Sequence, residues 1–166
     1  MKFGALLSSK GKDYFYIMHL SYNGDKREKL WDYATENNLI GLDAPGIVKG
    51  DWVKVRETAK KSLRKGWIRQ FDTFCSRIQK GDMVMVFSGI DSVLGVAEIT
   101  ESRHGYDRSL SDSEAFFDHI RRVNWVRKRK YADRLMLLKP LYGFSNTLSI
   151  VTQNSPRWPI LTDIDI

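Results

Sequence analysis

Apolar residues run without interruption through two neighbouring segments, MVMVF at residues 83–87 and VLGVA at residues 93–97. Continuous apolar runs of this length are typical of strands buried on both faces, whereas a strand with one solvated face alternates. Residues 13–22, DYFYIMHLSY, are rich in aromatic and β-branched types, which favour strands. We therefore predict a first strand at residues 13–22 and a hairpin-like pair of strands within residues 81–100.

Two other segments repeat their apolar positions with the period of a helix. Leu30, Trp31 and Ala34 share one face of a predicted helix over residues 26–37, and Asp25 and Glu28 resemble a capping box at its start. Residues 37–51 are predicted to be a loop with a short extended piece at residues 39–40. A longer helix is predicted over residues 57–80, with Gly66 as the candidate break between its basic and apolar halves. The apolar stripe of that helix is formed by Leu63, Trp67, Phe71, Phe74 and Ile78.

The last third of the chain begins with another predicted strand, HIRRVNWV at residues 119–126. Ile120 is expected to join Val123 and Trp125 on one face through a bulge, with Arg122 on the other face. Residues 132–144 fit a helix or a strand, and the tail is expected to pack through Trp158. The order of elements predicts one α+β domain over residues 1–166, with a curved mixed sheet or partly open β-barrel flanked by helices.

The charge of the chain indicates a class of binding partner. The 166 residues carry a net charge of +7, and the sequence pI is near 9.5. Lys and Arg are clustered in WVKVRETAKKSLRKGWIR at residues 52–69 and in RRVNWVRKRK at residues 121–130. Such clusters favour binding to a polyanion, and the alternative is a solvated, solubilising face. The apolar runs are too short to span a bilayer, and no leader peptide is visible, so we expect a cytoplasmic protein.

Catalytic and metal-binding patterns are weak in this sequence. The single cysteine, Cys75, excludes an internal disulfide and a cysteine zinc knuckle, and it is expected in the core. The three histidines lack the helical spacing of a metal site. Ser88 is not in a Gly-x-Ser-x-Gly elbow, no phosphate-binding glycine loop is present, and Asp91 and Glu98 lack the surroundings of a nuclease pair. We expect a binding module without catalytic residues, metal or cofactor.

Several motifs resemble one superfamily when they are read in order. VMVFSGIDSVLGVAEIT at residues 84–100 resembles the central strands of YTH domains and of EVE domains. KGDMVMVFSG is similar to an EVE pattern, and YFYIMHLSY resembles the first strand of both families. HIRRVNWV and LWDYATENNLIGLD resemble the PUA-like N-terminal DNA-targeting domains of archaeal McrB-type restriction proteins, with Leu42 where those domains have Trp. The resemblance covers residues 14–126.

This resemblance implies a PUA-like, YTH/EVE-like fold and a reader of modified bases. YTH domains hold the methyl group of N6-methyladenine in an aromatic cage, and EVE-like domains hold modified cytosines. The implied function is binding of methylated DNA by base flipping, with N6-methyladenine favoured, as the targeting module of a McrB-type restriction complex. The implied partners are an AAA+ GTPase domain in the same parent chain and a nuclease subunit. The alternatives are a reader of modified cytosine, an RNA-binding module, and a nuclease or base-modifying enzyme.

The candidate site residues come from the resemblance to YTH, EVE and McrB-type domains and from the basic clusters. Trp67 is the first candidate for a wall of the base pocket, with membership of the helical core as the alternative. Tyr106 is the second candidate wall, in competition with the pair Phe116 and Phe117. Candidate contacts to the base edge or its backbone are His19, Ser21, Tyr22, Ser88 and Asp43, and a structural histidine is the alternative for His19. Candidate phosphate contacts are Lys60, Lys61, Arg64, Lys65 and Arg69, with Arg127, Lys128 and the rest of the run to Lys130 as a second option.

Overall fold

The computed structural model describes residues 1–20, 25–42, 48, 50–89, 92–110, 117–134 and 147–166, with the backbone alone for residues 25 and 130–134. These residues group into two compact units. Unit 1 comprises Met1–Ser21, Asp82–Glu98 and Trp125–Ile166, and unit 2 comprises Tyr22–Gly81 and Ile99–Asn124. The single domain expected over residues 1–166 stays a prediction.

Unit 1 is built around a mixed sheet. Strand β1 (Tyr14–Leu20) pairs in parallel with β3 (Met83–Ser88) and antiparallel with β7 (Leu148–Thr152). Strand β3 pairs antiparallel with β4 (Ser92–Ile99), with a bulge between Val86 and Phe87. The burial of β3 and β4 on both faces confirms the prediction from their continuous apolar runs.

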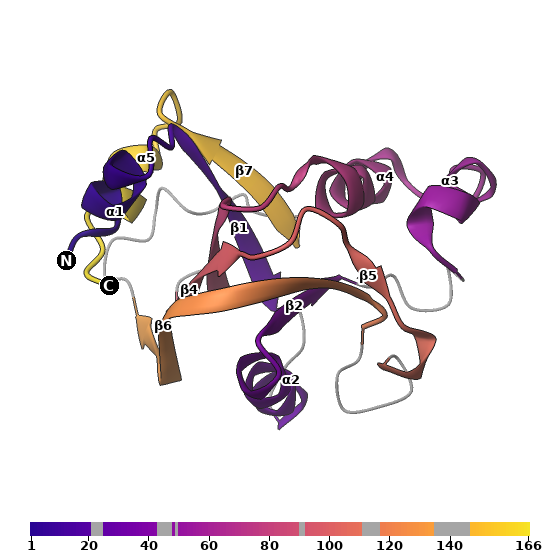
Figure 1. Cartoon of the computed structure of the whole chain (residues 1–166), viewed down its shortest axis with the longest axis horizontal. Coiled ribbons are helices and arrows are strands. Elements are labelled where there is room, and N and C mark those ends of the chain that lie inside the picture. Colours follow the sequence, from indigo (N-terminus) through magenta and orange to yellow (C-terminus); the bar gives the residue numbers. More distant parts are fainter. Residues whose placement is uncertain (21–24, 43–47, 49, 90–91, 111–116, 135–146) are drawn as a thin grey trace. The chain divides into compact units, whose positions relative to one another are not determined.

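Two short helices complete unit 1. Helices α1 (Phe3–Ser9) and α5 (Trp158–Thr162) lie side by side (Figure 1). Phe3, Phe15 and Leu161 are fully buried in one apolar cluster, and Trp158 packs against that cluster. This contact confirms that the C-terminal tail packs through Trp158, whereas helix α1 was not predicted.

Unit 2 consists mainly of helices with a small antiparallel sheet. Helix α2 (Asp25–Glu36) leads into β2 (Leu39–Leu42), which pairs with the first residues of β6 (His119–Arg134). Those residues pair on their other side with β5 (Gly105–Tyr106), and a short 3-10 helix, η2 (Arg108–Leu110), follows. The predicted α+β class with a mixed sheet and flanking helices is confirmed. None of the helices in the described ranges is long and apolar enough to cross a membrane.

The single helix predicted over residues 57–80 is wrong, because the segment folds as two helices and a π turn. Helix α3 (Trp52–Ala59) starts earlier, since the Asp51 carboxylate accepts a hydrogen bond from Val53 N at 3.0 Å. Helix α4 (Lys65–Asp72) starts after the extended residue Arg64 and contains Gly66, which therefore breaks nothing. The π turn η1 (Thr73–Arg77) closes with a hydrogen bond of 3.0 Å from Ile78 N to Thr73 O.

The expected bulge at the start of β6 is also wrong. His119, Arg121 and Val123 are buried, whereas Arg122 is exposed, so the strand alternates regularly. Ile120 lies on the same side as Arg122 and is only half-buried. Arg121 can be buried because its Nε donates to Phe74 O at 2.8 Å and its guanidinium also binds Ser102 O.

Candidate functional site

Trp67 lies in the first turn of α4 and is half-buried. Its ring centroid is 6.2 Å from that of Phe71, one helical turn later, with a tilt of 43° between the rings. Trp67 therefore belongs to the apolar stripe of the helix and still keeps part of its indole accessible. The two interpretations considered for Trp67, core residue and pocket wall, are compatible with this position.

Phe71 and His119 connect Trp67 to the second candidate wall. Phe71 is fully buried, stacks on Trp52 at 4.9 Å, and meets the His119 ring edge-on at 5.1 Å. The ring of His119 lies 5.1 Å from that of Tyr106, which is half-buried on β5. Trp67, Phe71, His119 and Tyr106 thus form a continuous series of ring contacts, which we call the aromatic chain. Both candidate walls belong to unit 2.

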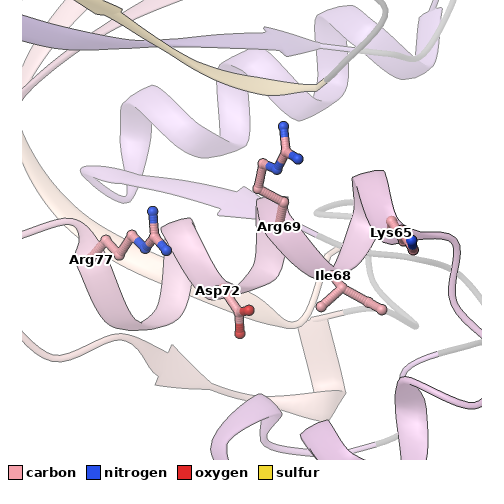
Figure 2. A pocket seen from close by; sticks show the side chains of 5 residues that line it. All are labelled: Lys65, Ile68, Arg69, Asp72 and Arg77. Atoms are coloured by element: carbon pink, nitrogen blue, oxygen red, sulfur yellow. The ribbon is translucent and has the colours of Figure 1, made fainter.

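A basic pocket lies along α4 and the π turn. Its volume is about 230 Å³, and Figure 2 shows its five lining residues, Lys65, Ile68, Arg69, Asp72 and Arg77. Lys65, Arg69 and Arg77 are exposed. Two of these three cations, Lys65 and Arg69, are predicted phosphate contacts, and Arg77 is an addition that the sequence did not single out.

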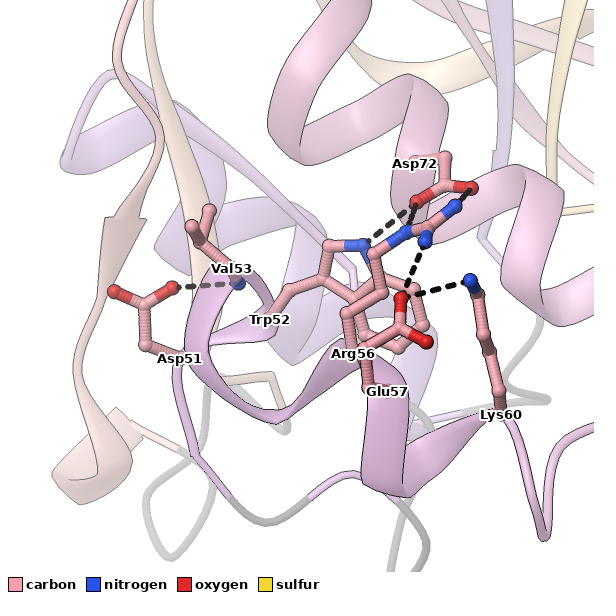
Figure 3. Close-up of polar contacts among 7 residues, drawn as sticks. All are labelled: Asp51, Trp52, Val53, Arg56, Glu57, Lys60 and Asp72. Carbon is pink, nitrogen blue, oxygen red and sulfur yellow. Dashed lines mark hydrogen bonds and ion pairs between the residues drawn. The ribbon is translucent and has the colours of Figure 1, made fainter.

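The one carboxylate in the pocket, Asp72, is bound to a cation from the neighbouring helix. Arg56 donates to its two oxygens at 2.6 and 2.8 Å, and Trp52 Nε1 donates at 3.0 Å (Figure 3). The hydrogen bond from Arg56 is the main reason why the pKa of Asp72 lies below its ordinary value. Because Arg56 balances the charge of Asp72, the cations of the pocket remain available to an anion.

The other predicted phosphate contacts are distributed over both units. Lys60 is half-buried and paired with Glu57 at 2.8 Å (Figure 3), whereas Lys61 and Arg64 are exposed. In unit 1, Arg127 is half-buried and donates to the Asp165 carbonyl, and Lys128 is exposed. The exposed members are the ones best placed to meet a phosphate.

His19 and Ser88 are in unit 1. His19 is buried, and its Nδ1 donates to Gly89 O at 2.6 Å. Burial lowers the pKa of His19, which favours the neutral ring. Ser88 is half-buried at the end of β3, where it pairs with Leu20. His19 therefore makes a structural contact in unit 1, and both His19 and Ser88 stay predicted contacts to a base.

The remaining candidates, Ser21, Tyr22, Asp43 and Phe116, lie outside the described residues. Phe117 is buried, which agrees with the expectation that one of the two adjacent phenylalanines belongs to the core.

One group of residues in unit 2 is absent from the sequence-based predictions. Cys75, His104 and His119 each offer a ligand atom, and these atoms all lie within 4.8 Å of one another. Burial raises the pKa of the Cys75 thiol and lowers that of His104. The three residues come from separate segments, so their spacing in the sequence gave no signal.

Comparisons with known proteins give a family and two distant structures. A family model described as "Domain of unknown function (DUF8426)" matches residues 16–141. No curated protein matches the chain. A crystal structure of the YTH domain of Zygosaccharomyces rouxii MRB1 in complex with N6-methyladenosine RNA is 16% identical, with a TM-score of 0.38; the match covers 73% of this chain and 61% of that one. An NMR structure of Rpa0253 from Rhodopseudomonas palustris is 11% identical, with coverages of 90% and 89% and a TM-score of 0.41.

Proposed function

Because the chain belongs to the family described as a domain of unknown function, DUF8426, we propose its role from its own residues: it is a nucleic-acid-binding module that takes up an unstacked, modified base. The observation that carries this proposal is helix α4, which presents a half-buried tryptophan, Trp67, and two exposed cations, Lys65 and Arg69. Trp67 is two residues from each cation, so it lies on a different side of the helix. An aromatic face and cations on one rigid element are what a base and its phosphates require.

The free energies involved favour this combination. A base that stacks on an aromatic side chain gains about 1–3 kcal/mol. A base in a duplex must first leave the stack, which costs a few kcal/mol. Phosphate contacts offset that cost without reading sequence. The buried Phe71 ring packs against Trp67, and the buried Trp52 stacks on Phe71 and donates a hydrogen bond to Asp72. These contacts hold α4 in place before a ligand binds.

The finer proposal is a reader of N6-methyladenine in DNA. Its support is the order of motifs in the sequence, above all Phe87-Ser88 followed by Gly95-x-Ala97-Glu98, which resembles YTH domains. In the aromatic chain, Trp67 and Tyr106 are the proposed walls. On the same resemblance, the module would target a McrB-type complex, with an AAA+ GTPase domain and a nuclease subunit as partners. Modified cytosine in DNA and methylated RNA are the competing ligands.

The test is a fluorescence-anisotropy titration of the purified chain at two salt concentrations. One duplex sequence carries N6-methyladenine, 5-methylcytosine or no modification, and a fourth probe is the same sequence as methylated RNA. We expect the tightest binding to the N6-methyladenine duplex. The preference should persist at high salt, because stacking is less screened than phosphate contacts.

The other outcomes are informative. A preference for 5-methylcytosine or for RNA would identify a different base or nucleic acid as the ligand and would still support a modified-base reader. Equal, steeply salt-dependent binding to all probes would support nucleic-acid binding through charge and would contradict a pocket for a modified base. Absence of binding to every probe would reject the proposal and return the basic clusters to a solubilising role.

A further inference from the structure

Cys75, His104 and His119 converge in unit 2 from three separate parts of the chain. Cys75 lies in the π turn η1, His104 directly precedes β5, and His119 is the first residue of β6. One ligand atom from each, the sulfur or a ring nitrogen, lies within 4.8 Å of the other two. A tetrahedral metal site with bonds of about 2.0–2.3 Å spaces its ligand atoms about 3.3–3.8 Å apart, so the three atoms are near enough to converge on one ion with small side-chain movements.

His119 is oriented in the way that metal-bound histidines usually are. Its side chain is fully buried, and its Nδ1 lies 2.8 Å from a carboxylate oxygen of Asp118. A carboxylate in this position holds the Nδ1–H tautomer and leaves the lone pair of Nε2 for a metal. Within the part of the chain that the structure describes, Nε2 of His119 is buried without a hydrogen-bond partner. A buried nitrogen in that state is costly unless a ligand binds it.

The neighbouring groups complete the surroundings of such a site. The rings of His104 and His119 are nearly parallel, at 5.9 Å and 20°. A carboxylate oxygen of Asp51 lies 3.3 Å from Nε2 of His104. Asp51 is also the N-cap of α3, so its position is already held by the fold. The carboxylates of Asp51 and Asp118 and a Cys75 thiolate together offset the charges of a divalent cation and of the buried Arg121.

We propose that Cys75, His104 and His119 bind a zinc ion, with the carboxylate of Asp51 placed to fill the fourth position. One thiolate and two imidazoles are a ligand set that suits Zn²⁺. Binding releases the thiol proton, and the metal then keeps the sulfur as a thiolate. The ion would join the π turn to β6 and fix His119 beside Tyr106. Its role is structural, and the inference does not depend on the proposed function.

The first experiment measures metal directly. The intact chain, purified without chelators, is analysed for zinc by inductively coupled plasma mass spectrometry, and the metal-free chain is titrated with Zn²⁺ and with Co²⁺. We expect about one zinc ion per chain, as one cluster requires. Cobalt should give tetrahedral absorption bands and a sulfur-to-cobalt charge-transfer band. Since Cys75 is the only cysteine of the chain, that band identifies its sulfur as a ligand.

Variants assign the other ligands. Cys75→Ser should remove the charge-transfer band, and His104→Ala should abolish stoichiometric zinc binding. Asp118→Asn should weaken zinc binding about 10–100-fold through the orientation of His119. His19→Asn is the matched control, because His19 is the one histidine of the chain outside the cluster, and it should bind zinc as the unmodified chain does. Circular dichroism of each metal-free variant shows whether it is folded.

Two results would overturn the proposal. One is a folded chain that neither retains zinc nor binds it in the titration. The other is zinc or cobalt binding that Cys75→Ser and His104→Ala leave unchanged, because the metal would then bind elsewhere. Loss of nucleic-acid binding alone would not affect the result, since every readout here is metal content or a metal spectrum.

Discussion

Arg56 and Asp72 form a pair of hydrogen bonds, 2.6 and 2.8 Å long, between helices α3 and α4. The same carboxylate accepts the indole N–H of the fully buried Trp52. Three donors on one carboxylate fix the angle at which α3 meets α4. The position of α4, which carries Trp67 and lines the basic pocket, therefore depends on Arg56, a residue that is not itself a proposed ligand contact.

The first prediction concerns this contact. Asp72→Asn removes a charged acceptor from Arg56 and Trp52 and should lower the free energy of unfolding by about 1.5 kcal/mol. The measurement is urea unfolding followed by tryptophan fluorescence. Glu57→Gln is the control, because Glu57 is highly exposed and pairs with Arg56 and Lys60 at the surface. A loss for Glu57→Gln as large as that for Asp72→Asn would contradict the special role of Asp72.

The variant Trp67→Ala distinguishes a role of Trp67 in the base pocket from a role in the core. If Trp67 stacks on a base, the variant should bind the preferred modified probe about 5–150-fold more weakly, the equivalent of 1–3 kcal/mol. Its unfolding midpoint should change little, because the indole is only half-buried. Trp67→Phe should retain part of the affinity. An unfolded Trp67→Ala chain would place Trp67 in the core, and unchanged affinity in a folded chain would remove it from the pocket.

Lys65 and Arg69 are predicted to contribute through phosphates. The double variant Lys65→Ala, Arg69→Ala should bind all duplexes more weakly and reduce the slope of log affinity against log salt by about 0.9 for each lost contact. Anisotropy titrations at several salt concentrations measure this slope. Lys26→Ala, Lys29→Ala on α2 removes the same charge from another exposed surface. Equal slopes for the two double variants would mean that the effect is net charge and that the pocket plays no part.

Gly41 is predicted to tolerate no side chain. A Cβ atom at this position would lie 2.0 Å from Cδ2 of the buried Phe117 ring. Gly41→Ala should therefore lower the free energy of unfolding by about 1–3 kcal/mol through overpacking. Gly11→Ala is the comparison, since no atom lies within 4 Å and only its positive φ of 63° is unfavourable, at about 1 kcal/mol. A smaller loss at Gly41 than at Gly11 would contradict the close packing.

His19 should make stability depend on pH. Burial lowers its pKa below the ordinary value of 6.5, so the unfolded chain binds the proton more readily than the folded chain. The free energy of unfolding should then fall as the pH decreases through 6.5, by at most about 1.4 kcal/mol per pH unit for this group. His19→Asn keeps a donor for Gly89 O and lacks the titration. Urea unfolding between pH 7.5 and 5.5 should show a shallower dependence for the variant, and identical dependences would exclude His19 as the cause.

Much of unit 1 could be predicted, because its signal is local. A continuous apolar run as short as residues 83–87, bounded by Gly81 and Gly89, favours a buried strand over a buried helix segment. The break between α3 and α4 could not be predicted in the same way. Residues 60–64, KKSLR, contain no glycine or proline, and the start of α3 depends on the side chain of Asp51, which lay within a predicted loop.

In the candidate site, too, local sequence patterns could predict some residues and not those that depend on tertiary contacts. Trp67 and Tyr106 could be selected from motifs, and they lie in one unit, joined through Phe71 and His119. Arg121 is embedded in a basic stretch, and its burial is explained by carbonyls distant in sequence, among them those of Phe74 and Ser102. Cys75, His104 and His119 are brought together by tertiary structure, so no spacing rule could find them.

The π turn at Thr73–Arg77 is a point where the chain can absorb a one-residue change in length. A π turn contains one residue more than the α-helical turn it replaces, and each residue of an α-helix advances the side chains by about 100° around its axis. Deletion of one residue between Asp72 and Ile78 would convert this turn into a regular α-helical turn. The residues that follow would then keep about their present direction, whereas the same deletion within α4 would rotate them by about 100°. We therefore expect a one-residue gap to be tolerated in the π turn more readily than in α4.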